Sequence, residues 1–419
     1  MPFETYVKPH IAAILTSRGL LTARRQAQEL KRRVRREPHI VRYFHDVSDP
    51  YCYLTSQVLV EFQRRYKVEL RPYLISGPPS DALPDPKAYH DNAIRDVMQL
   101  AKRFDMPSPK ISKPNVEAIS QAERILAAGI SCPDFATIAR QVSSDLWSGS
   151  DLPSMPEVDP SNVMNAGDRA LAAAGHYLGG TFQYAGEWYW GVDRLHYLES
   201  RLQQAGLGER VSPIVPVPRL QAENAFEEGR QVEFFFSFRS PYSYLAFDRI
   251  RDLTCRHNAK LILRPVLPML MRGLPVPSLK SSYILKDCAR EARRMEIPFG
   301  RICDPLGKGV ERGYALLDFA EGQGLLPEFC AAFMSGVWAD GLNAATDQGL
   351  SKIVRRAGLI WKDAQADLNA TGWLSRITAN QDHLQEIGLW GVPSFRVGGR
   401  SIWGQDRLWA VEDLLTGTR

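Results

Sequence analysis

The chain alternates short apolar runs with longer stretches of helical periodicity. Residues 232–238 are apolar and rich in aromatic side chains, which predicts a buried strand. Pro241 follows Ser240, and proline is tolerated at the first helical position, so a helix is expected to begin there. Residues 260–265 predict a second strand. This part of the chain therefore begins with the order strand, helix, strand.

The rest of this region predicts a helical insertion followed by a hairpin. Roughly a hundred residues after residue 265 show helical periodicity with caps and glycine punctuation. Residues 394–397 and 400–403 flank Gly398 and Gly399, a pair typical of a two-residue hairpin turn. A final helix is expected from Arg407. The complete order, β-α-β, helices, β-β-α, indicates an α/β domain with a helical insertion.

The same pattern occurs twice in the chain. Residues 41–54 align with residues 232–245, and six of the fourteen positions are identical. Two further pairs of segments follow in the same order, 96–107 with 287–298 and 190–195 with 403–408. Because the order is kept, we interpret the chain as a duplicated domain.

The expected organisation has four parts. A basic N-terminal helical segment, residues 1–37, precedes the first copy of the domain, residues 38–206. Residues 207–231 contain three prolines in a non-periodic stretch and predict a semi-extended linker. The second copy occupies residues 232–419.

The N-terminal segment has the pattern of a basic amphipathic helix. Its apolar residues recur at helical spacing and are surrounded by basic ones. The apolar positions are Ala23, Ala27, Leu30 and Val34, and the basic ones are Arg24, Arg25, Lys31, Arg32, Arg33, Arg35 and Arg36. We expect a helix packed on the first copy with its basic face in solvent, because no aromatic anchor or groove-reading motif accompanies the charge. A role at a membrane surface or with nucleic acid is the alternative.

Composition limits the class of protein. The chain has 419 residues, of which 44% are hydrophobic and 24% charged, and its mean hydropathy is -0.26. These values are typical of an ordinary globular protein, and no apolar stretch approaches the length of a membrane span. The net charge of +5 is small for this size and gives no general argument for nucleic-acid binding.

The cysteines and the N-terminus suggest a reducing compartment. Six cysteines lie far apart, without a C-x-x-C motif or a His/Cys group at metal spacing, so neither bound zinc nor a disulfide framework is expected. Residues 11–15 are apolar, but Arg18 follows without the small residues of a cleavage site, so no secretory signal is expected. The expected location is the cytoplasm.

The start of the predicted helix at Pro241 is the candidate site. A helix N-terminus offers backbone N–H groups and the positive end of a dipole, and the Ser240 hydroxyl adds one more donor. Such a site lowers the pKa of a thiol. Ser240 and Ser243 cannot form a disulfide, which excludes dithiol chemistry in this copy. A thiol must therefore arrive with a cofactor.

The second copy resembles a known family. Its element order, the Ser-Pro-Tyr-Ser turn at residues 240–243 and the Gly-Val-Pro-Ser-Phe sequence at residues 391–395 resemble the thioredoxin fold with a helical insertion, of the DsbA and kappa type. More narrowly, this copy is similar to the 2-hydroxychromene-2-carboxylate isomerase and kappa-class glutathione transferase family, and the first copy resembles it more weakly. The resemblance implies an α/β fold with two thioredoxin-like domains, each with a helical insertion, and glutathione as the cofactor.

The resemblance also implies how the thiol and one end of glutathione are held. Ser240 matches the family serine that stands where redox thioredoxins have cysteine, and it would orient the thiolate. Lys280 precedes Tyr283 by three residues and Asp287 by seven, which is the family spacing for its lysine. The carboxylates of glutathione need a cation, and Lys280 would supply it.

Three further positions are implied around the other end of glutathione. Val392 and Pro393 match the family's cis-proline and the residue before it, whose backbone pairs with the cysteinyl unit. Asp406 matches the acidic residue that holds the γ-glutamyl amine. Gln405 stands where the family has a serine near the γ-glutamyl carboxylate. No metal ligand is implied.

Each of these residues also has a structural explanation that the sequence leaves open. Ser240 before Pro241 is an ordinary N-cap, and Asp406 would cap the last helix. Lys280 would be a solvated lysine at a helix start. Pro393 would shape a turn, since a cis bond at this position is implied by the resemblance alone.

The first copy departs from the family at most of these positions. Asp49 stands at the place of Ser240, and a carboxylate there would repel a thiolate. Cys52 has no partner cysteine and is expected to be an ordinary buried residue rather than a reactive thiol. In the first copy Gly180 stands at the position of Pro393, and Tyr89, with Lys87 nearby, stands at the position of Lys280. The aspartates of the second copy are retained as Asp96 and Asp193. We expect that the first copy does not activate glutathione.

The leading functional hypothesis is a glutathione-dependent isomerase that acts on an aromatic pyruvate-like enone, a small molecule. A kappa-type glutathione transferase is the alternative in the enzyme class, and a noncatalytic interaction or chaperone module is the alternative outside it. Family members commonly pair two such domains as a homodimer. A fused first copy would replace the second subunit, so that the two domains pair within one chain and the protein acts as a monomer.

Overall fold

The computed structural model describes residues 3–220 and 229–417. Its contacts divide the chain into two compact units. We call residues 23–218 with 277–280 the N-terminal unit, and residues 1–22, 219–276 and 281–419 the C-terminal unit, as far as they are described. Part of the predicted linker, residues 221–228, lies outside the described residues.

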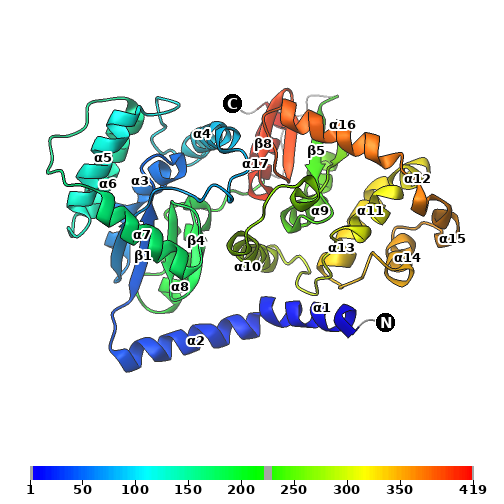
Figure 1. Cartoon of the computed structure of the whole chain (residues 1–419), viewed down its shortest axis with the longest axis horizontal. Coiled ribbons are helices and arrows are strands. Elements are labelled where there is room, and N and C mark those ends of the chain that lie inside the picture. The colour runs from blue at the N-terminus through cyan, green and yellow to red at the C-terminus, as the bar shows by residue number, and fades with distance from the viewer. Residues whose placement is uncertain (1–2, 221–228, 418–419) are drawn as a thin grey trace. The chain divides into compact units, whose positions relative to one another are not determined.

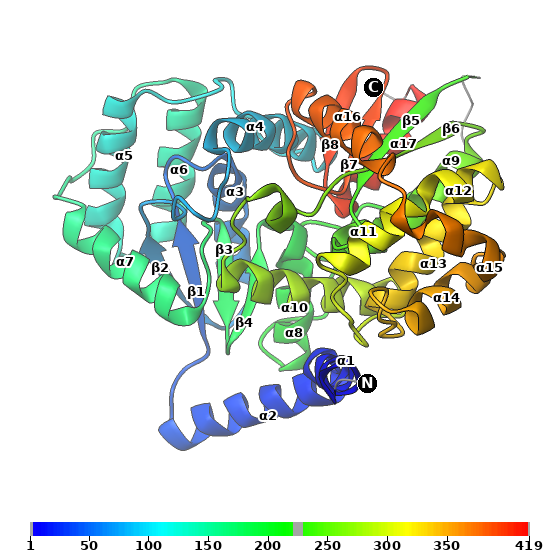
Figure 2. The same ribbon diagram turned by 45° about the vertical axis from the view of Figure 1, so that its right-hand side comes forward.

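The N-terminal unit contains a four-stranded sheet in the order β2-β1-β3-β4. β1 and β4 are labelled in Figure 1, and all four strands are labelled in Figure 2. The strands are β1 (Ile40–His45), β2 (Glu69–Leu74), β3 (Thr181–Tyr184) and β4 (Glu187–Trp190). β1 is parallel to β2 and antiparallel to β3, and β3 is antiparallel to β4. Parallel neighbours need a crossover, which α3 (Pro50–Arg65) provides between β1 and β2.

Helices pack on this sheet and on one another. Besides α3 they are α4 (Pro86–Arg103), α5 (Val116–Gly129), α6 (Phe135–Ser148), α7 (Ser161–Ala174) and α8 (Leu195–Gln204). α2 (Arg18–Arg35) begins in residues assigned to the C-terminal unit and continues in the N-terminal unit from Ala23. Phe62 of α3 packs on Phe182 of β3, with ring centroids 5.6 Å apart. α7 approaches β2 so closely that a Cβ on Gly167 would lie 1.8 Å from the carbonyl oxygen of Leu74, so glycine is required there.

The C-terminal unit contains a sheet with the same order and the same pairing directions, β6-β5-β7-β8. The strands are β5 (Gln231–Phe236), β6 (Lys260–Pro265), β7 (Ser394–Val397) and β8 (Arg400–Trp403). The predicted strands 260–265, 394–397 and 400–403 are confirmed to the residue, and the apolar run 232–238 forms β5 and the loop after it. Their apolar patterns are local, which is why the sequence located them.

The helical insertion predicted between β6 and β7 is also confirmed. The helices of the C-terminal unit are α1 (Phe3–Thr16), α9 (Pro241–Arg256), α11 (Lys308–Ala315), α12 (Leu317–Gly322), α13 (Leu326–Trp338), α14 (Asp347–Arg356), α15 (Trp361–Ala364), α16 (Trp373–Glu386) and α17 (Leu408–Thr416). Figure 2 shows α11 to α15 gathered next to one another. α10 (Ser278–Arg294) begins in residues assigned to the N-terminal unit and continues in the C-terminal unit.

β5 lies at the centre of its sheet and is apolar on both faces. On one face Phe234 and Phe236 lie 5.7 Å and 5.4 Å from Phe247 of α9, measured between ring centroids. On the other face Phe235 shares a buried cluster with Leu384 of α16. Burial of both faces holds the end of β5 in place, and this end leads directly to Ser240.

The orientation of α2 differs from the prediction. The helix forms, but its half-buried side chains include Arg25, Glu29 and Arg32, and its apolar residues from Ala23 onward are exposed, whereas Leu20 and Leu21 are half-buried. Leu30 is 64% exposed and Val34 is 75% exposed. The expectation of a solvated basic face holds for the exposed residues Arg24, Lys31, Arg33, Arg35 and Arg36. It does not hold for Arg25, which is half-buried and paired with Glu187 of β4.

No helix in residues 3–220 and 229–417 combines the length and the apolar character needed to cross a membrane. The same residues contain no group of three His, Cys, Asp or Glu side chains arranged to hold a metal ion.

Candidate functional site

Ser240 ends the loop between β5 and α9. Its backbone is extended, with φ of -93° and ψ of 112°, and Pro241 occupies the first turn of the helix, where no N–H is needed. The Ser240 oxygen accepts a 3.1 Å hydrogen bond from the backbone N–H of Ser243. Ser240 is therefore the N-cap of α9. This role uses only the acceptor capacity of the hydroxyl, which also has a proton to donate.

The Ser240 proton points to the loop before β7. Oγ of Ser240 donates to the carbonyl oxygen of Val392 over 3.3 Å, which is long for a bond between two oxygens. The peptide bond between Val392 and Pro393 is cis, as the resemblance implied. The loop before β7 therefore meets the first turn of α9. A stronger acceptor, such as a thiolate, would displace the carbonyl as the partner of this hydroxyl.

Ser243, the last residue of the four-residue turn, is a buried structural residue. Its side chain is fully buried, and Oγ accepts a 3.4 Å hydrogen bond from the backbone N–H of Ser237. All six cysteines of the chain are free thiols, and none occurs in residues 237–243. The turn therefore has no sulfur of its own, and a thiol would have to come from a bound molecule.

Tyr242 and Asp287 form a contact that sequence reasoning did not single out. The Tyr242 hydroxyl donates a 2.8 Å hydrogen bond to Asp287, which is 1% exposed. In the N-terminal unit the Tyr51 hydroxyl donates a bond of the same length to Asp96. Both pairs are 45 residues apart in the sequence, and this shared spacing was the available signal. The bond connects the first turn of α9 to α10.

Asp406 and Gln405 lie together in a short 3-10 helix, Gln405–Arg407, but their environments differ. The Asp406 side chain is 25% exposed, and its Oδ1 lies 3.4 Å from an Nη atom of Arg407. The residue directly before α17 is Arg407, and its side chain makes no capping hydrogen bond. Gln405 is buried, accepts a 2.7 Å bond from Arg249 and donates a 3.0 Å bond to Glu291. Asp406 is accessible to a ligand, whereas the Gln405 amide is engaged in a buried network.

Lys280 lies in the first turn of α10 and is assigned to the N-terminal unit. Its Nζ donates a 2.9 Å hydrogen bond to the carbonyl oxygen of Ala82. Burial lowers the pKa of the Lys280 ammonium. Lys280 is therefore not a simple solvated lysine, because its ammonium group is hydrogen-bonded to a neutral backbone carbonyl.

The N-terminal unit has an acidic residue at the corresponding cap. Asp49 is the N-cap of α3, and its carboxylate accepts a 2.8 Å hydrogen bond from the backbone N–H of Tyr51. The side chain is buried and Asp46, also buried, lies nearby. Burial, together with the Asp46 charge, raises the pKa of Asp49 to about 8. Asp46 is a member of this cluster that sequence reasoning did not identify.

Cys52 is buried in the same cluster. Its Sγ accepts a 3.2 Å hydrogen bond from the backbone N–H of Asp46. Burial and the two neighbouring aspartates, Asp49 and Asp46, raise the pKa of the Cys52 thiol well above its usual value. The thiol is therefore held neutral and out of solvent, which matches the expectation of an ordinary buried cysteine.

Comparison with known proteins identifies the domain that contains Ser240. Residues 231–416 match the family described as the DSBA-like thioredoxin domain. The chain is similar to 2-hydroxychromene-2-carboxylate isomerase of Sphingobium xenophagum, with 25% identity over 44% of this chain and 98% of that protein. It is also similar to glutathione S-transferase kappa 1 of Rattus norvegicus, with 25% identity over 44% of this chain and 91% of that protein. A solved structure of a 2-hydroxychromene-2-carboxylate isomerase is similar at 23% identity with a TM-score of 0.37, over 44% of this chain and 93% of that one.

The resemblance inferred from the sequence is thus confirmed for the C-terminal part of the chain. Residues 231–416 form a DsbA-like thioredoxin domain with relatives named as isomerases and as a kappa glutathione transferase.

Proposed function

We propose that the C-terminal unit binds glutathione with its sulfur at the first turn of α9 and catalyses an isomerisation of the 2-hydroxychromene-2-carboxylate isomerase type. The proposed substrate is an aromatic pyruvate-like enone. One observation carries the proposal: the Ser240 hydroxyl stands at the start of a helix and its proton is held by a long bond to Val392. The names of the relatives support the class of activity.

The residues at the start of α9 fit a sulfur anion. The cap is a neutral hydroxyl, and the helix that follows has 16 residues, so its N-terminus favours negative charge. Rotation of the Ser240 hydroxyl from the Val392 carbonyl would give a bound thiolate one strong hydrogen bond while Oγ keeps the cap bond from Ser243. Stabilisation of the anion in this way lowers the pKa of the bound thiol.

The proposed roles of the chain's own residues follow from this arrangement. Bound glutathione would supply a thiolate nucleophile for reversible addition to the conjugated double bond, chemistry that allows rotation about the former double bond before elimination restores it. Ser240 holds the sulfur in its anionic form before the addition and after the elimination, and it is not the nucleophile. The backbone of Val392, which Pro393 follows, pairs with the cysteinyl unit.

The ends of glutathione are proposed to be held by charge. Lys280 holds a carboxylate and exchanges its bond to the Ala82 carbonyl for this stronger partner. Asp406, which is partly exposed, holds the γ-glutamyl ammonium. Gln405 acts as a positioning residue, because its buried amide is bonded to Arg249 and Glu291 and fixes the backbone next to Asp406.

Glutathione transfer to an electrophile is the second candidate function. The observation in its favour is the similarity to a protein named glutathione S-transferase kappa 1. Transfer uses the same thiolate but has no elimination step, so glutathione is consumed. Isomerisation returns free glutathione, and product analysis therefore separates the two.

We also propose that the N-terminal unit is a second, noncatalytic thioredoxin-like domain that takes the place of the other subunit of a homodimer. Its sheet has the same strand order and directions as the sheet of the C-terminal unit. The proposal expects the intact chain to be a monomer by light scattering. A dimer that persists on dilution would contradict it.

Calorimetric titration of the intact protein with glutathione tests the proposed function. We expect binding by the native protein and a raised thiol pKa in Ser240→Ala, followed through the ultraviolet absorbance of the bound thiolate. Removal of one donor at comparable anion sites costs about 2.7–4 kcal/mol. Asp49→Ala, at the corresponding cap of α3, is the matched control and should leave glutathione binding unchanged. Absence of binding to the native protein would favour a noncatalytic module and overturn the proposal.

A further inference from the structure

From Ala23 onward, α2 exposes its apolar side chains to solvent. Ala23, Ala27, Leu30 and Val34 recur at intervals of three and four residues and are all exposed. Because 3.6 residues complete one helical turn, these four residues form a stripe along one side of the helix. We call them the apolar stripe. A stripe of this kind normally packs on a core, and here it does not.

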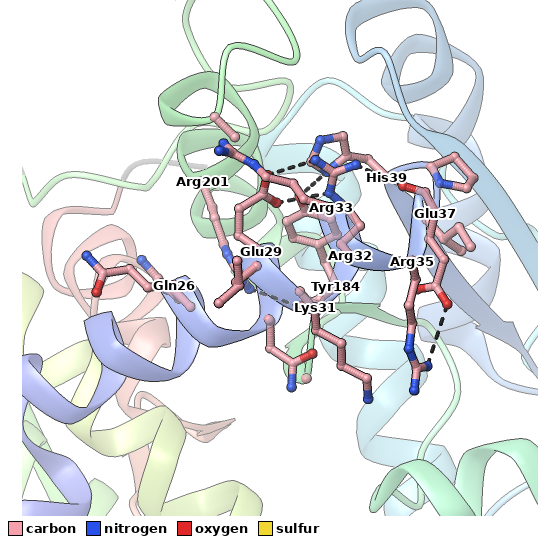
Figure 3. A pocket seen from close by; sticks show the side chains of 18 of the residues that line it. Gln26, Glu29, Lys31, Arg32, Arg33, Arg35, Glu37, His39, Tyr184 and Arg201 are labelled. Atoms are coloured by element: carbon pink, nitrogen blue, oxygen red, sulfur yellow. Dashed lines mark hydrogen bonds and ion pairs between the residues drawn. The ribbon is translucent and has the colours of Figure 1, made fainter.

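The opposite side of α2 carries charged residues that form ion pairs, one of them to β4. Arg25 donates two hydrogen bonds, of 2.7 Å and 2.8 Å, to Glu187 of β4. Arg32 pairs with Glu29 and donates a 2.8 Å bond to the carbonyl oxygen of Glu37. Figure 3 shows Glu29 and Arg32 beside His39 and Tyr184, in the pocket of about 860 Å³ that α2 forms with this unit. The Arg25–Glu187 pair joins this side of α2 to β4, whereas the Arg32 bonds are local to residues 29–37. The side of α2 that carries the apolar stripe is thus the one opposite to this link.

Basic residues flank the apolar stripe. Residues 23–35 contain six basic residues and one acidic residue, Glu29. Within the part of the chain that the structure describes, the side chains of Arg24 and Lys31 form no ion pair or hydrogen bond. Arg33 is bonded to Glu29, yet its side chain is 71% exposed. The exposed side of α2 therefore combines a central apolar stripe with positive charge at its margins.

We propose that α2 is a membrane-surface helix that binds anionic lipid. The apolar stripe would enter the boundary between headgroups and acyl chains, while Arg24, Lys31 and Arg33 contact phosphates and acidic headgroups. The Arg25–Glu187 ion pair on the other side of α2 would connect the N-terminal unit to the helix. This attachment is peripheral and is independent of the proposed glutathione chemistry.

Charge and chemistry favour lipid over the other occupants of such a face. A second copy of the chain would bring two basic margins together, which is unfavourable. A nucleic acid would match the charge but would leave Leu30 and Val34 without a partner. An anionic bilayer matches both the stripe and its margins.

Sedimentation of the intact protein with lipid vesicles tests the proposal. We expect binding to vesicles of phosphatidylcholine and phosphatidylserine, weaker binding as salt is added, and no binding to phosphatidylcholine alone. The double variant Leu30→Gln/Val34→Gln should bind at least about tenfold more weakly. The double variant Arg24→Gln/Lys31→Gln should bind more weakly with a shallower dependence on salt.

Controls separate lipid binding from other effects. Val116 of α5 is 72% exposed, similar to Val34, so Val116→Gln should leave vesicle binding unchanged. Circular dichroism should show that the variants keep the fold, since all substituted residues are exposed. Binding that does not depend on Leu30 and Val34, or no binding to phosphatidylserine vesicles, would overturn the proposal. Binding of an RNA oligonucleotide in preference to vesicles, or a dimer lost in Leu30→Gln/Val34→Gln, would assign the face to another occupant and also overturn it.

Discussion

The first turns of α3 and α9 have similar backbone conformations, but their capping side chains differ in charge. Each helix has 16 residues and begins with proline after a capping side chain. In each unit a tyrosine of the first turn donates a 2.8 Å bond to an aspartate, Tyr51 to Asp96 and Tyr242 to Asp287. The cap is the buried acid Asp49 in α3, whereas in α9 it is a serine.

This difference shows that the helix N-terminus is not sufficient to define an anion site. Both helices present backbone N–H groups to their caps, Tyr51 to Asp49 and Ser243 to Ser240. In α3 the cap itself is the group that becomes an anion, and its pKa of about 8 shows how unfavourable that charge is in the buried site. In α9 the neutral hydroxyl leaves the positive potential for a ligand.

The most severe test transfers the acidic cap of α3 to α9. Ser240→Asp removes the hydroxyl donor and places a carboxylate beside the proposed thiolate. Loss of one donor at comparable sites costs about 2.7–4 kcal/mol, and charge repulsion adds to it, so glutathione binding in calorimetry should fall more than about a hundredfold. Ser240→Asn, which keeps a capping side chain, is the control for folding. Undiminished binding to the Ser240→Asp protein would show that the sulfur lies elsewhere.

The second test removes the acidic cap of α3, Asp49, and concerns the pH dependence of the free energy of unfolding. The folded-state pKa of Asp49, about 8, exceeds the ordinary value of 3.8, so the folded protein retains a proton that the unfolded chain releases between these two pH values. The contribution of protonated Asp49 to the free energy of unfolding is therefore complete below pH 3.8 and is lost as the pH rises to about 8. Each pKa unit corresponds to about 1.4 kcal/mol. Asp49→Asn should remove this dependence and gain stability relative to the native protein as the pH rises.

Urea unfolding across that pH range measures the Asp49 effect. Asp85→Asn is the matched control, because Asp85 also caps a helix, α4, but is exposed. It should leave the pH dependence unchanged. Parallel stability curves for the native protein and Asp49→Asn would contradict the raised pKa.

A smaller loss of glutathione affinity is expected on substitution of Lys280, whose counterpart in the N-terminal unit is Tyr89. Lys280→Ala should weaken glutathione binding by about 1.5–3 kcal/mol, the contribution of a charged hydrogen bond, and Lys280→Arg should retain part of it. Lys87→Ala, which removes an exposed lysine near Tyr89, serves as the control in the same calorimetric titration. If Lys280→Ala lowers thermal stability but not affinity, the bond to Ala82 is its main role.

The smallest effect on activity is expected on substitution of Cys52, whose counterpart in the C-terminal unit is Ser243. Burial and a raised pKa should keep the Cys52 thiol unreactive toward a disulfide reagent until the protein unfolds, whereas the exposed Cys255 should react in the native state. Mass spectrometry of the labelled peptides distinguishes the two. Cys52→Ser should leave activity unchanged, and a loss of activity would assign the N-terminal unit a chemical role.

Much of the fold and part of the site followed from local patterns in the sequence. The strands at 260–265, 394–397 and 400–403 and the helix start at Pro241 were located correctly, because alternation and capping involve neighbouring residues. Ser240 was identified as a cap and as a candidate donor for the same reason. The thioredoxin-like character of residues 231–416 was indicated by a resemblance that combined the order of these elements with the motifs at residues 240–243 and 391–395.

The tertiary structure decided what depends on partners distant in the sequence. Only the fold shows that Gln405 is buried between Arg249 and Glu291, that Lys280 is bonded to Ala82, and that Asp46 is buried beside Asp49. It also turned the apolar stripe of α2 to solvent, because the ion pair between Arg25 and Glu187 joins residues 162 positions apart. Periodicity gives a helix its faces, but the charges it meets after folding determine which face is buried.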